Sequence, residues 1–132
     1  MLAGLSEWLD AYGDAWRKRD PDCAARLFAE DAVYHWGPSG KKLRGRPVIR
    51  EAWAEATEAQ DNVEFGYEVM SASSRGGLVR WWCSYDQVQR GTRVKDEGVF
   101  RLAFDEEGLC NSLEEWFNET EEPLDGAGPE AV

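Results

Sequence analysis

Two acidic residues share the phase of the apolar residues on their predicted strands. Asp96 is in phase with Phe100 and Leu102, and Glu115 is in phase with Phe117. Alternate strand residues face the same side of a sheet, so both carboxyl groups are expected to face inward. Burial raises the pKa of a carboxyl group, which suits a general acid or base near neutral pH. The alternative for Asp96 is a one-residue slip near the adjacent turn, which turns it outward.

His35 is the only histidine of the chain and a further catalytic candidate, as a general base or proton shuttle. Its phase is opposite to that of Tyr34 and Trp36, which favours the alternative of a structural or surface histidine. No cluster of histidine and cysteine residues has the spacing of a zinc site, and no glycine-rich phosphate loop joins a strand to a helix. The sequence therefore predicts neither a metal nor a cofactor.

Aromatic residues supply a possible ligand pocket, since seven are tryptophan and all aromatics make up 12% of the chain. Those with the phase of an inner wall, and hence predicted to bind a ligand, are Tyr12, Trp16, Tyr34, Trp36, Trp53, Trp81 and Tyr85. The alternative is that these rings only fill a core, as aromatic stripes commonly do. A pocket of this kind suits a flat, apolar molecule with one or two polar groups. Its acidic walls favour a neutral or cationic ligand over a carboxylate.

The elements that must position these residues follow from the periodicity of the chain. Leu5, Trp8, Leu9, Tyr12 and Trp16 have helical spacing, which predicts an amphipathic helix over residues 5–19. Further helices are predicted from Pro21 and Pro47, a short strand over 31–36, a basic loop over 41–46, and four long strands over 63–70, 79–86, 99–104 and 111–118. Three helices on one face of a curved, mainly antiparallel sheet give the class α+β.

Composition limits the partners of the protein. The 132 residues correspond to one domain over 1–119, and the acidic Pro/Gly tail over 120–132 is expected to be disordered. A formal charge of −11 disfavours nucleic acid and anionic membranes. The three cysteines are widely spaced and no targeting segment is evident, so a cytoplasmic protein with reduced thiols is expected.

The order of the predicted elements resembles the nuclear transport factor 2-like superfamily. The strings over 20–33, 43–50 and 98–104 look like parts of its SnoaL-like branch, and the resemblance covers residues 5–118. It implies a cone-shaped barrel in which a curved sheet and three helices enclose a pocket. The superfamily includes isomerases, cyclases, dehydratases, hydrolases and non-catalytic binding modules, so the resemblance specifies the fold more closely than the function.

The catalytic pattern of ketosteroid isomerases in this superfamily matches the chain in one of three positions. It combines an Asp base on the first strand with a Tyr and a protonated Asp that form an oxyanion hole. Tyr12 matches the Tyr, but the base position falls on Trp36 and the second acid on Gly98. The resemblance therefore makes Tyr12 a candidate hydrogen-bond donor and disfavours steroid isomerisation by that route.

Two tryptophans, Trp82 and Trp116, are out of phase with the predicted pocket and lie on the opposite face of the sheet. Arg80 and Arg101 share this face, where they could pair with Glu114. Members of the superfamily commonly dimerise through this face, so the resemblance implies a homodimer.

The sequence is compatible with two functions. The first is a SnoaL-like protein that binds a small hydrophobic, cyclic ligand, with Asp96 or Glu115 abstracting a proton next to a carbonyl and Tyr12 donating to the enolate. Such a protein is a cofactor-independent isomerase, lyase or cyclase. The second is a non-catalytic binding or interaction module whose pocket is filled by its own tryptophans.

Overall fold

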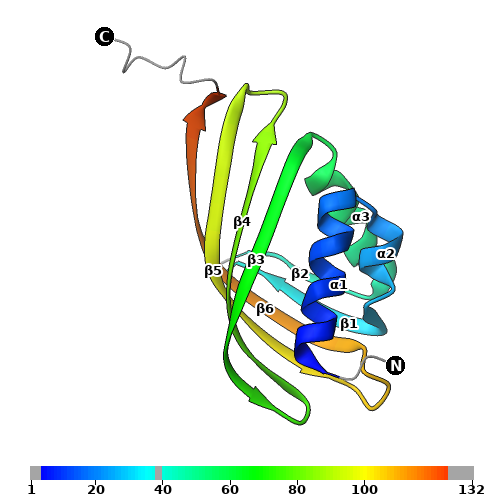
Figure 1. The fold of residues 1–132 in the computed structure, drawn as a ribbon. Helices are drawn as coiled ribbons and strands as arrows, with labels where there is room; N and C mark the ends of the chain where they lie inside the picture. Colours follow the sequence, from blue (N-terminus) through cyan, green and yellow to red (C-terminus); the bar gives the residue numbers. More distant parts are fainter. Residues whose placement is uncertain (1–3, 38–39, 125–132) are drawn as a thin grey trace.

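A single curved sheet with helices on its concave side forms the molecule (Figure 1). The computed structural model describes residues 4–37 and 40–124. The helices are α1 (Leu5–Lys18), α2 (Pro21–Ala25) and α3 (Arg46–Thr57). The strands are β1 (Phe28–Trp36), β2 (Lys42–Arg44), β3 (Gln60–Ser73), β4 (Gly76–Gln87), β5 (Thr92–Phe104) and β6 (Cys110–Pro123). The predicted α+β class is confirmed.

The six strands are arranged in the order β2-β1-β6-β5-β4-β3. Strands β1 and β6 run parallel, and every other neighbouring pair is antiparallel. The sheet is curved but not closed, so β2 and β3 form its two edges. Consecutive hairpins over β3–β6 keep the alternation of side chains in register across four strands, which brings the predicted inward residues to one face.

Helices α1 and α2 begin where the sequence predicts, and α3 begins at Arg46, one residue before the predicted Pro47. Asp20 caps α2, since its Oδ1 accepts a hydrogen bond from the backbone N–H of Cys23 at 3.1 Å, and Pro21 occupies the first turn.

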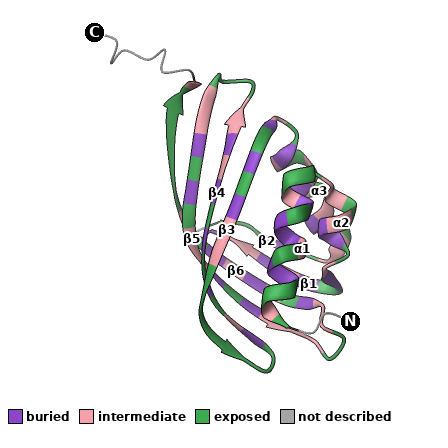
Figure 2. Ribbon diagram, viewed as in Figure 1, coloured by how far each residue is buried: buried purple, intermediate pink, exposed green. Residues whose placement is uncertain are grey.

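Among the described residues, no helix is both long and apolar enough to cross a membrane. Figure 2 shows the buried positions of the strands alternating with exposed ones, as expected for a sheet that is covered on one face only.

Several boundaries differ from the sequence prediction, and β5 begins at Thr92 rather than at residue 99 because it pairs with β4 and β6 as far as Thr92. Strand β1 begins at Phe28 rather than at residue 31, and residues 42–44 form the edge strand β2 instead of a loop. Strand β2 pairs with β1 through Val33↔Arg44, and its charged residues are typical of an exposed edge. Residues 120–123, predicted as tail, extend β6 because β5 offers partners as far as Thr92. The rest of the predicted tail, residues 125–132, lies outside the described residues.

The core is built largely of aromatic rings between α1 and the sheet. Trp8 stacks on Tyr12 with 5.0 Å between ring centroids, and Trp81 stacks on Phe100 at 4.8 Å. The indole N–H of Trp8 donates to the carbonyl oxygen of Leu27 at 2.9 Å, which satisfies its one polar atom. Aromatic packing thus holds the helices against the concave face.

Candidate functional site

A cavity of about 130 Å³ lies between α1, α3 and the concave face of the sheet. Its walls include every aromatic residue predicted to bind a ligand: Tyr12, Trp16, Tyr34, Trp36, Trp53, Trp81 and Tyr85. Both predicted carboxyl groups, those of Asp96 and Glu115, line the same cavity. The structure therefore brings together nine of the ten residues that the sequence selects, and His35 is the exception.

The aromatic walls also belong to the core, so the two interpretations of these residues are compatible. The ring of Tyr12 lies 6.0 Å from those of Trp16 and Trp53, measured between centroids. Trp16 in turn lies 6.1 Å from Trp81. Tyr12 and Trp81 are almost completely buried, whereas Trp16 and Trp36 are partly exposed. The packed inner rings leave only a small space near the more exposed ones.

Hydrogen bonds link three aromatic side chains to Glu115. The indole N–H of Trp53 donates to the Tyr12 hydroxyl oxygen at 3.1 Å, and the Tyr12 and Tyr34 hydroxyls lie 3.3 Å apart. The Tyr34 hydroxyl donates to Oε1 of Glu115 at 2.7 Å. With the Tyr34 proton directed to Glu115, the Tyr12 proton is directed to Tyr34. Tyr12 therefore positions Tyr34, and its own proton is not free for a ligand in this arrangement.

Glu115 is 6% exposed, and burial raises its pKa to about 7. The hydrogen bond from Tyr34 acts in the opposite direction, because it stabilises the charged form. Burial also raises the pKa of Tyr12 and of Tyr34, so both hydroxyls keep their protons at neutral pH. Glu115 is the group of this hydrogen-bonded chain that can change its charge near pH 7.

Asp96 is 8% exposed and lies directly across the β5–β6 ladder from Glu119. Burial, followed by the neighbouring Glu119 and Glu115 carboxyl groups, raises its pKa to about 8. Its Oδ1 is buried and has no hydrogen-bond partner. The indole N–H of Trp81, on the same inner face, also lacks a partner. Unpartnered buried polar atoms are costly, and here both belong to residues of the cavity wall.

His35 does not reach the cavity, which corrects its selection as a catalytic candidate. It lies on β1 between Tyr34 and Trp36, both of which face inward. Its Nδ1 lies 3.7 Å from Oε2 of Glu114, a residue of the outer face. Because side chains alternate along β1, His35 faces outward and is a structural or surface histidine, the alternative that its phase favoured.

Sequence reasoning missed several cavity residues, namely Ala56, Thr57, Gln60, Phe117 and Glu119. Phe117 shares the phase of Glu115 within the predicted strand, and Glu119 continues this phase just beyond residue 118, so a longer predicted strand would have found Glu119. The indole N–H of Trp16 donates to the side-chain oxygen of Gln60 at 2.8 Å, a contact between segments 44 residues apart. No local pattern predicts a contact of that kind.

The two mismatches with the ketosteroid isomerase pattern have structural explanations. Trp36 lines the cavity where the pattern requires a carboxylate, and it stacks on Tyr34 with 5.5 Å between centroids. Gly98 faces β6 so closely that a Cβ there would collide with the carbonyl oxygen of Trp116. A side chain at residue 98 would force the two strands apart, so the close packing of β5 against β6 excludes a carboxyl group there.

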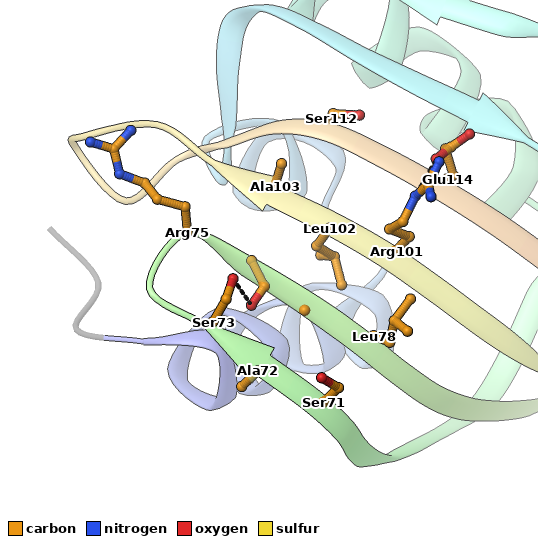
Figure 3. A pocket seen from close by; sticks show the side chains of 12 residues that line it. Ser71, Ala72, Ser73, Arg75, Leu78, Arg101, Leu102, Ala103, Ser112 and Glu114 are labelled. Atoms are coloured by element: carbon orange, nitrogen blue, oxygen red, sulfur yellow. Dashed lines mark hydrogen bonds and ion pairs between the residues drawn. The ribbon is translucent and has the colours of Figure 1, made fainter.

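A larger hollow of about 440 Å³ lies on the outer face, near the β3–β4 turn (Figure 3). It is open, and Arg101 within it pairs with Glu114 (Nε to Oε1, 2.6 Å). Ser73 uses its hydroxyl to donate to the carbonyl oxygen of Gly76 at 3.4 Å. The charged groups of the outer hollow are already engaged in ion pairs, and no buried titratable group lines this hollow. The smaller inner cavity is therefore the stronger candidate for a catalytic site.

The described part of the chain contains no group of three or more His, Cys, Asp or Glu side chains that could hold a metal ion.

Comparisons with known proteins agree with this architecture. The model of the SnoaL-like domain family matches residues 9–112. No curated protein sequence matches the chain significantly. Among solved structures, the epoxide hydrolase/cyclase-like enzyme SalBIII, with a role in pyran ring formation in the polyether salinomycin, is 19% identical, with a TM-score of 0.74 over 86% of this chain and 89% of that one.

Two further structures have the same fold. Delta 5-3-ketosteroid isomerase from Mycobacterium sp. is 18% identical, with a TM-score of 0.72 over 88% of this chain and 96% of that one. A computationally designed 17-OHP binder is 18% identical, with a TM-score of 0.75 over 89% and 96%. At these identities the likeness shows the fold alone.

Proposed function

The chain belongs to the SnoaL-like domain family, and we propose that it binds a small hydrophobic, cyclic molecule in the aromatic cavity and moves a proton on it. Catalysis of this kind is a cofactor-independent isomerisation, elimination or cyclisation. The proposal is supported by one observation above all: Asp96 and Glu115, both buried, line the same aromatic cavity.

The two carboxyl groups suit an acid–base pair because their surroundings differ. The pKa of Glu115 is raised to about 7 and that of Asp96 to about 8. Between these values Glu115 is largely ionised and can accept a proton, whereas Asp96 is largely protonated and can donate one. We assign the base to Glu115, which Tyr34 orients, and the acid to Asp96.

The reaction proceeds by proton transfer next to a carbonyl group. Glu115 takes the proton, the C–H electron pair moves into the carbonyl, and the oxygen gains negative charge. The unpartnered indole N–H of Trp81 is the available donor for that oxygen, since the Tyr12 hydroxyl is engaged with Tyr34. Asp96 then gives its proton to the enolate, and exchange of protons with solvent restores the ionised Glu115 and the protonated Asp96.

The size of the cavity limits the ligand. Ligand sites commonly measure about 300–1,000 Å³, and this cavity measures about 130 Å³. A single ring or a small branched group fits without rearrangement. Part of a larger ligand would remain outside the cavity, next to the partly exposed side chains of Trp36 and Phe117.

The binding step is tested by titrating tryptophan fluorescence with small cyclic ketones and terpenoids. Saturable quenching that Ala56→Phe abolishes supports binding in the cavity, because Ala56 lines it and a larger side chain fills it. Ala54→Phe is the control, since Ala54 lies on α3 outside the cavity wall. The absence of saturable quenching across the series would contradict the proposal.

The chemical step is tested by hydrogen–deuterium exchange at the carbon next to the carbonyl of a ligand that binds. The parent protein should accelerate exchange in D₂O, and Glu115→Gln should reduce the rate about 100-fold or more while the ligand still quenches fluorescence. Equal rates in the parent and Glu115→Gln would contradict a catalytic role for Glu115.

A second candidate function, a homodimeric interaction module, is favoured by the outer face. Trp82 is 40% exposed and Trp116 is 39% exposed, and the guanidinium groups of Arg80 and Arg101 lie 4.9 and 5.9 Å from their ring centroids. Large exposed tryptophans on a sheet face are typical of an interface. Sedimentation velocity of the Trp82→Ser/Trp116→Ser variant tests this function: the dimer should dissociate, and a parent protein that is monomeric at micromolar concentration would exclude it.

A further inference from the structure

We propose that the cavity is specific for a ligand with a small organic cation, an alkylated ammonium group that sits against the aromatic rings beside Asp96. This inference rests on the proposed ligand-binding function and adds the charge of the ligand. It depends on three features of the cavity: its set of charged groups, its unpartnered carboxyl oxygen and its aromatic walls.

The titratable groups of the cavity wall are all acidic or phenolic. They come from α1, β1, β4, β5 and β6, and they are Tyr12, Tyr34, Tyr85, Asp96, Glu115 and Glu119. No Lys, Arg or His is among the described residues that line the cavity. Three carboxyl groups thus share one small space without a positive partner, and a cationic ligand is the group that would compensate them.

Asp96 indicates where the cation would lie. Its residue is more than nine-tenths buried, and its Oδ1 makes no hydrogen bond. A buried carboxyl oxygen without a partner is costly in free energy, and proteins normally pair such groups. The neighbouring Glu119 shares a hydrogen bond with Asp96 while one of the two carboxyl groups is protonated, but it repels Asp96 when both are ionised. An ammonium group beside Asp96 would relieve both costs.

The aromatic walls recognise the same chemistry independently of the carboxyl groups. The π faces of Trp and Tyr attract cations, and alkylated ammonium groups are bound in aromatic cages. Here Trp16 lies 6.3 Å from Trp53 and 6.1 Å from Trp81 between ring centroids, and Trp36 and Tyr85 complete the wall. A cavity of about 130 Å³ suits a compact head group. The net charge of −11 would also attract cations at long range.

The test compares choline with its neutral carbon isostere, 3,3-dimethyl-1-butanol, by tryptophan fluorescence and calorimetry at constant ionic strength. The two molecules have nearly the same shape and differ in charge. At pH 9 choline should bind at least about tenfold more tightly than the isostere. Between pH 9 and pH 6 its affinity should fall about tenfold, because protonation removes the carboxylate charges, while the affinity of the isostere stays constant.

Asp96→Asn keeps the shape of the side chain and removes its charge, so it should reduce choline affinity about tenfold and leave isostere affinity unchanged. The matched control is Glu97→Gln, which removes a carboxylate from the next residue, on the outer face, and should change neither affinity. The pH dependence of the parent protein is a second measurement that needs no variant.

The outcomes separate this inference from the function on which it rests. Equal affinity for the two molecules, or choline binding that is independent of pH, would overturn the cation assignment and leave ligand binding in the cavity intact. Binding of neither molecule, in a protein that also fails to bind the cyclic ketones, would overturn both. Quenching by sodium chloride equal to that by choline would show simple screening and overturn the cation assignment.

Discussion

The two faces of the sheet place carboxyl groups of adjacent residues in opposite surroundings. On β5, Asp96 faces the cavity without a cationic partner, whereas Glu97 lies outside with its Oε1 3.5 Å from Nη2 of Arg80. On β6, Glu115 is buried and accepts a hydrogen bond from Tyr34, whereas Glu114 pairs with Arg101. The position of a residue in the alternation of its strand therefore decides whether its carboxyl group is buried and protonates near neutral pH or lies outside and forms an ion pair.

The largest expected difference between the two faces is in packing. Trp81 is 2% exposed and stacks on Phe100, so Trp81→Ala should lower the free energy of unfolding by about 4 kcal/mol. The adjacent Trp82→Ala should cost about 1 kcal/mol or less in the monomer, since Trp82 is 40% exposed. Urea denaturation at low protein concentration measures both, and equal losses would contradict the assignment of the faces.

A second prediction concerns stability and pH. The pKa of Asp96 in the folded protein is about 8, above the value of about 4 in an unfolded chain. The folded protein keeps a proton that the unfolded chain releases, so this contribution is complete below pH 4 and is lost as pH rises to about 8. Asp96→Asn should therefore raise the free energy of unfolding at pH 8 by about 5 kcal/mol and leave it nearly unchanged at pH 4.

Glu97→Gln is the control for that experiment, because it removes a carboxylate from the adjacent outward position. Its effect at pH 8 should be below about 0.5 kcal/mol, since Glu97 and Arg80 form an exposed ion pair. Equal stabilisation by the two variants would assign the effect to net charge rather than to the cavity.

A smaller change tests the link between Tyr34 and Glu115. Tyr34→Phe removes the hydroxyl that donates to Oε1 of Glu115. Because that hydrogen bond lowers the pKa of Glu115 against the effect of burial, its loss should raise the pKa by about one unit. Carbon-13 NMR of the Glu115 carboxyl group measures this shift. The control is Tyr67→Phe, which removes a hydroxyl that donates to Asp10, outside the cavity wall. A lowered or unchanged pKa in Tyr34→Phe would contradict the proposed orientation of the hydrogen bond.

The smallest effect is expected on the outer face. Arg80→Gln removes the ion pair with Glu97 and the contact of the guanidinium group with Trp82. Both interactions are exposed, so the free energy of unfolding should fall by less than about 1 kcal/mol at low salt. The loss should shrink further in 0.5 M sodium chloride, and a loss above 2 kcal/mol would require a buried role for Arg80.

Much of this comparison could be predicted from sequence, because it depends on a period of two. Alternation placed Asp96 and Glu115 inside and His35, Trp82 and Trp116 outside. It could not predict strand β2, since this three-residue segment, with Leu43 between two basic residues, forms a strand only through pairing with β1. The contact of Trp16 with Gln60 and the engagement of Tyr12 with Tyr34 join distant segments, and the cavity volume depends on how all the rings pack.

The most direct test of the account is a pH titration of the carboxyl carbon signals of Asp96 and Glu115 by NMR in the ligand-free protein. Asp86 is the internal reference, since its hydrogen bonds with Asn62 and Arg93 lower its pKa below the ordinary range. Midpoints near pH 8 for Asp96 and near pH 7 for Glu115 are expected. Midpoints near pH 4 for both residues would contradict the proposed acid–base pair, because neither carboxyl group could then donate a proton at neutral pH.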